Sequence, residues 1–305
     1  MDLPTEPARR PRARGGRTGF AALALGAALV LGACATVPQG VSHAAPSSPT
    51  DAAAHTEAGA DRALDTFALL RQAADHEGLY CLVGGLKPMS TGIWRGELQV
   101  ENPDLKELRA VRAALAPVRN EVWYADVMVF AKAHEGERSA DAYVVHRGAL
   151  ARTIERFGPF WSQWGIAPCT HPAEVVAIVE RLPEADRWRA YGYLFGVPAE
   201  AVEFFVEAGQ AAAGRDDVGP GKDRQFVQIP TFAAESGRFT YAVPLHHERT
   251  AADEALASEA SRILRAYAER REGLADTGSL IAGLRRLDRQ FEPSAASAAV
   301  VRDER

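Results

Sequence analysis

Apolar residues recur at three- and four-residue spacing in several parts of the chain, as they do on the buried face of a helix. Signals that favour a helix start precede most of these segments, among them Pro172, Pro198 and a capping box formed by Thr250 and Asp253. The pattern predicts helices over 61–76, 102–115, 172–182, 198–209, 251–267 and 280–287.

Two other segments have the pattern of short strands. Residues 79–83 form a continuous apolar run that ends at a pair of glycines. Residues 93–100 alternate between apolar and polar side chains, which is typical of a half-buried antiparallel strand.

A hairpin is predicted further along the chain. Its strands are residues 226–234 and 238–244, joined around Ser236 and Gly237. Pro230 lacks a backbone N–H, so we expect it at a sheet edge or in a bulge.

Residues 121–132 fit two patterns. Aromatic and β-branched residues favour a buried strand, whereas the spacing of Val122, Ala125 and Val129 also fits a helix. We favour the helix because no turn signal interrupts the segment. The predicted fold is α+β, mostly helical with a small antiparallel sheet, in a single domain.

The N-terminal region has the charged, apolar and small-residue order of a secretory signal. Arginines at positions 9, 10, 12, 14 and 17 precede an uncharged run over 20–31, which continues into Gly32, Ala33 and Cys34. Leu31 to Cys34 resembles the lipobox of bacterial lipoprotein precursors, and the resemblance covers the first 35 residues only.

The resemblance implies cleavage after Ala33 and diacylation of Cys34, which would anchor the protein in the cell envelope outside the cytoplasm. Ala35 follows the cysteine where an acidic residue would favour retention at the inner membrane, so the outer membrane is favoured in a cell that has one. The alternative is an uncleaved anchor, because residues 20–37 lack charge and approach the length that spans a bilayer core of about 30 Å.

The resemblance and the composition together divide the chain into four parts. Residues 1–33 are the expected signal peptide, and residues 34–60 the lipidated cysteine with a flexible tether that is poor in large apolar side chains. Residues 61–290 form the globular domain, and residues 291–305 a disordered tail.

The chain is acidic, with 40 Asp and Glu against 35 Lys and Arg and a net charge of −5. A nucleic acid partner is therefore not expected, because binding to phosphates needs clustered basic residues. The expected partners are the membrane, through the lipid, and an envelope protein or glycan.

Two cysteines remain besides Cys34. A disulfide between Cys81 and Cys169 would suit an oxidising compartment, and two unpaired buried thiols are the alternative.

The glycine-rich loop 84–92 could bind an anion, because it combines approachable backbone N–H groups with Lys87 and Ser90. A turn between two strands explains the same residues, and the glycine spacing is not that of a phosphate-binding loop. His246, His247 and Glu248 supply three potential ligands, but the adjacent His246 and His247 would point to opposite faces of an extended segment, so we expect no metal site.

No motif points to a cofactor, and none to a reaction. We expect a non-catalytic envelope lipoprotein that binds a ligand, a glycan or another envelope protein. The alternative is an envelope hydrolase that acts on a glycan or peptide. The candidate ligand-binding or active-site residues are Lys87, Ser90, Arg238, His246 and Glu248.

Overall fold

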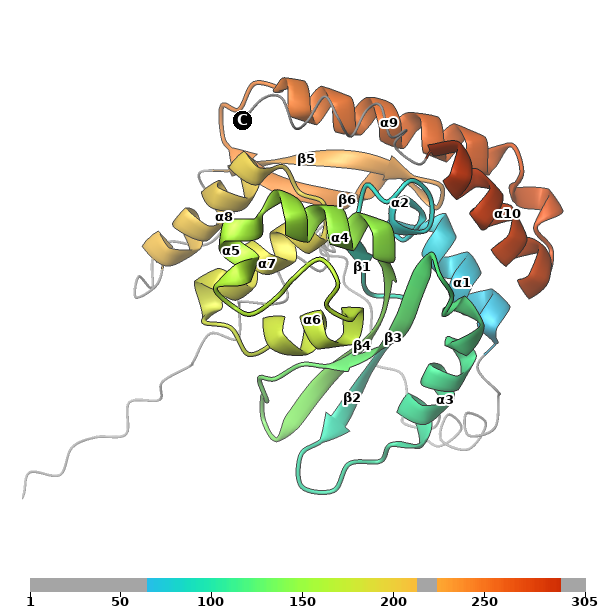
Figure 1. The fold of residues 1–305 in the computed structure, drawn as a ribbon, viewed down its shortest axis with the longest axis horizontal. Coiled ribbons are helices and arrows are strands. Elements are labelled where there is room, and N and C mark those ends of the chain that lie inside the picture. The colour runs from blue at the N-terminus through green and yellow to red at the C-terminus, as the bar shows by residue number, and fades with distance from the viewer. Residues whose placement is uncertain (1–64, 213–223, 292–305) are drawn as a thin grey trace, which may run out of the picture.

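The computed structural model describes residues 65–212 and 224–291, without the side chains of residues 234–238 (Figure 1). The predicted signal peptide, Cys34, the tether and the tail beyond Phe291 lie outside the described residues. Within the described ranges, no helix combines the length and the apolar character that crossing a bilayer requires.

Helices make up most of the described structure. They are α1 (Thr66–Asp75), α2 (Leu79–Leu82), α3 (Lys106–Ala114), α4 (Arg147–Arg156), α5 (Gly158–Ser162), α6 (Pro172–Val179), α7 (Glu184–Leu194), α8 (Ala199–Ala212), α9 (Ala251–Ala268) and α10 (Thr277–Phe291), with short 3-10 turns η1 (Ala116–Val118) and η2 (Arg271–Gly273). The strands are β1 (Met89–Ser90), β2 (Arg95–Gln99), β3 (Trp123–Val129), β4 (Glu137–His146), β5 (Arg224–Thr231) and β6 (Ala234–Pro244).

The larger sheet is built around β4, because its other strands all pair with β4 and are antiparallel to it. β3 lies along one side of β4, with Trp123 opposite His146 and Val129 opposite Ala140. β2 and the short β1 share the other side. β3 is therefore an edge strand.

Successive side chains of β3 and β4 point to opposite faces of the sheet, and each face is covered by helices (Figure 1). One face packs against α1, α2 and α3, and the other against α4 to α8. The first face presents Trp123, Ala125, Ala142 and Val144, and the second presents Tyr124, Met128, Tyr143 and Val145.

The second sheet is the β5–β6 hairpin, which α9 crosses at the top of Figure 1. Ile229 and Phe239 of the hairpin and Ile263 of α9 join the first of the two cores. The C-terminal part of the described chain thus completes a core that begins with α1.

The α+β class with a small antiparallel sheet is confirmed. The capping box at Thr250 forms both of its hydrogen bonds with Asp253. The hairpin also forms, and its register shifts between Ile229 and Thr231, at Pro230, where a bulge is one of the two predicted outcomes.

The predicted strand over 79–83 is wrong, because Leu79–Leu82 is the helical turn α2. These residues and Val83 are completely buried. A short run that is apolar on every side has no period, so the sequence pattern cannot distinguish a strand from a buried helical turn.

The helix favoured over 121–132 is also wrong, because Trp123–Val129 is the strand β3. Asn120 starts the strand by accepting hydrogen bonds from the N–H groups of Val122 and Trp123. Its partner β4, which the sequence pattern did not predict, decides the conformation.

Two boundaries are corrected as well. α3 begins at Lys106, where Asp104 accepts a hydrogen bond from the Lys106 N–H, and not at residue 102 as predicted. The hairpin turns at residues 232–233 and not at Ser236, because Thr231 pairs with Ala234.

Candidate functional site

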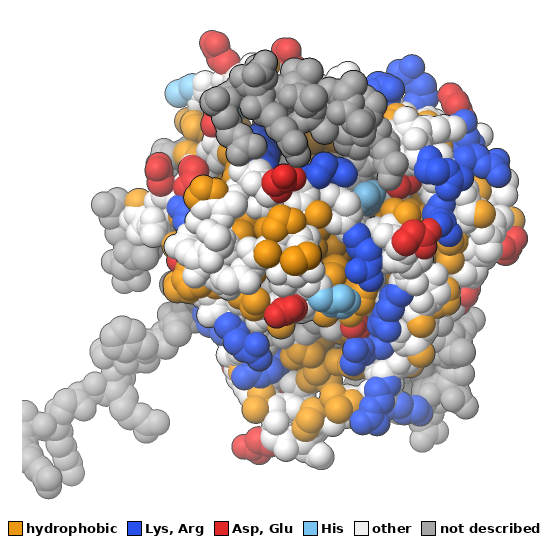
Figure 2. All heavy atoms as spheres, in the orientation of Figure 1, with side chains coloured by type: hydrophobic (Ala, Val, Ile, Leu, Met, Phe, Trp, Pro, Cys, Tyr) orange, Lys and Arg blue, Asp and Glu red, His pale blue; other side chains and the backbone are white. Residues whose placement is uncertain are grey.

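A groove of about 500 Å³ lies between the second half of β3 and α6. Residues 126–131 form one wall, and α6 with the residues that follow it forms the other. Ala173, Val176 and Ala177 make the α6 wall apolar. Figure 2 shows an apolar hollow below α6, with blue side chains on both sides of it.

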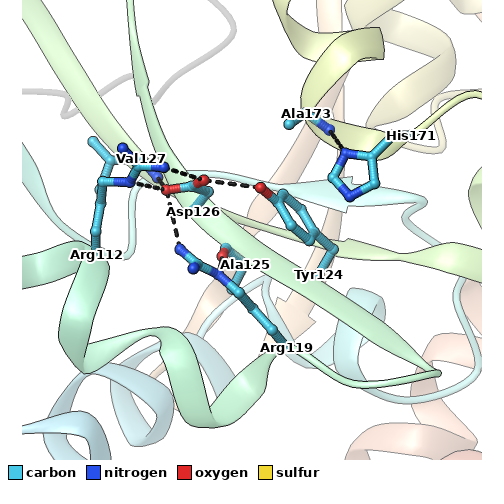
Figure 3. Close-up of polar contacts among 8 residues, drawn as sticks. All are labelled: Arg112, Arg119, Tyr124, Ala125, Asp126, Val127, His171 and Ala173. Atoms are coloured by element: carbon cyan, nitrogen blue, oxygen red, sulfur yellow. Dashed lines mark hydrogen bonds and ion pairs between the residues drawn. The ribbon is translucent and has the colours of Figure 1, made fainter.

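Asp126 stands at the end of the groove nearest α3 and η1 (Figure 3). Its carboxylate accepts two hydrogen bonds from Arg112, at 2.7 and 3.1 Å, and lies 3.2 Å from Nη2 of Arg119. The Tyr124 hydroxyl and the Val127 N–H donate to it at 2.8 Å. Burial raises the pKa of Asp126, but these donors outweigh it and the net pKa is lowered.

Cationic and aromatic side chains surround Tyr124. The guanidinium groups of Arg119 and Arg147 lie over its ring, 5.7 and 5.3 Å from the centroid. The His171 ring meets it edge to face at 4.7 Å, while His171 Nδ1 accepts a hydrogen bond from the Ala173 N–H and caps α6 (Figure 3). At this end of the groove, contacts around Tyr124 connect β3 with α4 and with the start of α6.

Glu180 closes the other end of the groove. Its carboxylate accepts hydrogen bonds from the Ala131 N–H, at 2.9 Å, and from the Tyr191 hydroxyl. Arg138 donates to the carbonyls of Phe130 and Ala131. The backbone that follows β3 is therefore hydrogen-bonded to the side chains of Glu180 and Arg138.

The outer edge of β3 is open between these two ends. Phe130 donates to the Ser139 carbonyl and Arg147 to the Val122 carbonyl, so even-numbered residues of β3 bond to β4 and odd-numbered ones face outward. Arg119 caps the Ala125 carbonyl. Within the described ranges, nothing bonds the Val127 carbonyl or the N–H and carbonyl of Val129.

The rim of the groove is cationic. Arg112 and Arg119 bound one end, and Arg138 and Arg181 line the other. Against these four guanidinium groups, the groove holds the carboxylates of Asp126 and Glu180. When Arg112 and Arg119, which contact Asp126 without lining the groove, are included, these groups carry a net positive charge in a chain whose net charge is −5.

Lys87 does not line this groove and is 3% exposed. Its ammonium group pairs with Glu77 at 2.5 Å and lies over the rings of Phe195 and Phe239, at 5.2 and 4.7 Å from their centroids. Lys87 therefore joins the two cores, since Phe195 belongs to one and Phe239 to the other.

The start of the glycine-rich loop is bonded to the Asp288 side chain of α10. The Gly84 N–H donates to the Asp288 carboxylate at 2.8 Å, and His146 Nε2 lies 3.2 Å from the same oxygen. A Cβ on Gly85 would approach that of Ala149 to 2.7 Å. Ser90 and Lys87 are both buried, so neither side chain is accessible to a ligand from solvent.

The other candidates lie elsewhere. His246 and Glu248 are exposed, while His247 between them bonds to Asp253 at 2.7 Å in the capping box. The side chain of Arg238 is outside the described residues. No described contact joins one of these candidates to another, so they form no common site.

The two cysteines are not bridged. Cys81 is a buried thiol that donates to the carbonyls of Pro88 and Val144, and Cys169 is an exposed thiol in a loop. Burial raises the pKa of Cys81 to about 12, which keeps it protonated and unreactive.

Sequence reasoning missed the groove because β3 and α6 are far apart in the chain. One signal was available: Asp126 interrupts an apolar segment, and a buried carboxylate requires nearby donors. Among the residues that the structure describes, no three acidic, histidine or cysteine side chains come together to hold a metal.

Comparisons of the chain with protein-family models, with curated proteins and with solved structures found no match.

Proposed function

We propose that this protein is a lipid-anchored, non-catalytic binding protein of the bacterial cell envelope, and that an anionic partner binds in the groove between β3 and α6. The lipobox-like sequence at Cys34 supports the anchor. The groove supports the binding role.

One observation carries the proposal: a groove with one apolar wall has guanidinium groups near both ends while the chain as a whole is acidic. Arg112 and Arg119 share the single carboxylate of Asp126, so their combined charge is only half neutralised. Arg181 is exposed and bonds only weakly to the Ala177 carbonyl, at 3.4 Å. An anion at the rim would gain charge-assisted hydrogen bonds that the chain leaves unused.

Fluorescein-labelled poly-L-glutamate tests the binding role on the full-length protein in detergent micelles. Arg181→Glu reverses a charge at the rim and should weaken binding by at least about tenfold, and added salt should weaken it further. Arg289→Glu makes the same change on α10, which does not line the groove, and should bind as the wild type does.

Blocking the groove tests its position without a change of charge. Ala177→Trp should fill the groove and abolish binding, whereas Ala255→Trp, at an exposed position on α9, should not. Equal binding by wild type, Arg181→Glu and Ala177→Trp would refute the groove as the binding site.

A further inference from the structure

The open edge of β3 lies along one wall of this groove. We infer that the partner is an extended acidic peptide segment that adds to β3 as a further strand. The inference rests on the proposed function, because it names the class of partner for the same groove.

The open segment of the edge is short and is bounded by side chains. Arg119 caps the Ala125 carbonyl before it, and Glu180 bonds the Ala131 N–H after it. Exposed sheet edges invite unwanted pairing, and proteins usually cover them. This chain covers the edge on both sides of residues 127–129 and leaves the segment that lines the groove uncovered.

The available groups fit one added strand. In an antiparallel pair, alternate residues exchange hydrogen bonds with alternate residues of the neighbour. The Val127 carbonyl would accept one bond, and Val129 would donate one and accept one. The Val127 N–H already donates to Asp126 at 2.8 Å, so the peptide gains three backbone bonds at this edge.

Side chains of the added strand would alternate between two surroundings. Those on the face shared by Tyr124 and Met128 would lie toward the apolar wall of α6. Those on the opposite face would lie toward α3, which carries exposed Lys106, Arg109 and Arg112 at three-residue spacing. A peptide in which apolar residues alternate with acidic ones would therefore complement both surroundings.

A short fluorescein-labelled peptide in which valine and glutamate alternate is the probe, with fluorescence anisotropy of the full-length protein as the readout. Val129→Pro removes one outward N–H that the peptide would bond, so it should weaken binding at least about tenfold. The variant should still fold, because an edge strand tolerates proline where its N–H faces solvent. Glu97→Pro is the matched control, since residue 97 faces outward on the other edge strand, β2. It should bind as the wild type does.

Peptides that are N-methylated at alternate backbone nitrogens provide a second measurement, which does not depend on the folding of a variant. Strand addition predicts that one methylation pattern abolishes binding and the complementary pattern does not. Equal binding of both methylated peptides and the unmodified one would overturn the inference.

A polyacrylate oligomer of equal charge separates this inference from the proposed function. It should bind more weakly than the peptide and should not respond to Val129→Pro. If it binds as tightly as the peptide and Val129→Pro affects neither, strand addition is overturned while anion binding stands. If neither probe binds, the proposed function falls as well.

Discussion

At the scale of single residues, Asp253 shows how one carboxylate can order a helix start. It accepts hydrogen bonds from the Tyr241 hydroxyl at 2.5 Å, from His247 at 2.7 Å, and from Thr250. Burial raises the pKa of Asp253, but these donors outweigh burial and lower it to about 2.

Asp253→Asn should therefore destabilise the protein by roughly 1.5–3 kcal/mol at neutral pH, the usual contribution of a hydrogen bond to a charged group. The folded-state pKa is below the ordinary value, so Asp253 stabilises the fold above about pH 4, and this contribution is lost as the pH falls toward 2. Urea unfolding at a series of pH values measures the effect. Equal stability of variant and wild type at pH 7 would contradict the role assigned to Asp253.

The pKa of Asp141 is shifted in the opposite direction to that of Asp253. Its carboxylate is 3% exposed, one oxygen has no hydrogen-bond partner among the described residues, and Arg95 lies 3.6 Å away. Burial raises the pKa of Asp141 to about 6, and the charge of Arg95 offsets only part of this rise.

Because the folded-state pKa of Asp141 is raised, the folded protein binds the proton more tightly than the unfolded chain. Asp141 therefore costs stability as the pH rises from about 4 to 6. Asp141→Asn should remove that pH dependence and be at least as stable as the wild type at pH 7. Thermal unfolding between pH 4 and 7 measures this, and parallel curves for the two proteins would contradict it.

At the scale of elements, β3 alternates between residues that bond to β4 and residues that face outward. Met128→Pro would remove an N–H from the ladder with β4 and should lower the free energy of unfolding by roughly 1–3 kcal/mol, because its acceptor on β4 is left unsatisfied. Val129→Pro removes an outward N–H and should cost much less. Urea unfolding of both variants checks the register, and equal losses would contradict it.

Local signals in the sequence predicted those elements that depend on neighbours in the chain. The capping box joins residues three apart, and Pro230, which lacks an N–H, stands where the hairpin register shifts, so both features have a local signal in the sequence. β3 required a partner strand, β4, that the pattern did not show. α2 was too short for its period to be visible.

The groove could not be predicted from the sequence for the same reason. It exists only where β3 and α6 meet, and its charge depends on how Arg112 reaches Asp126 from α3. Lys87, which the sequence marked as a candidate ligand group, instead forms an internal pair with Glu77. A residue type indicates chemistry, but only the tertiary contacts show whether that chemistry is already used within the fold.

At the scale of the whole molecule, the proposed anchor and groove would work together. Two acyl chains hold a protein at a membrane stably, at about 0.8 kcal/mol per buried CH₂, so salt should not release it. The groove would then act on partners at the envelope surface.

Cys34→Ala should abolish acylation and move the protein out of the membrane fraction. Metabolic labelling with palmitate, followed by membrane fractionation with a high-salt wash, measures both effects. Cys169→Ala is the matched control, because Cys169 is the exposed thiol of the described domain, and it should remain in the membrane fraction. Unlabelled wild-type protein, or Cys34→Ala protein that stays at the membrane, would contradict the anchor.

The most direct test of the central claim is amide hydrogen exchange of the full-length protein with and without the alternating valine–glutamate peptide. The account predicts new protection over residues 127–131 and over α6, with no change in the loop 84–92 or around His246. If the peptide leaves amide exchange over β3 and α6 unchanged, the account is contradicted.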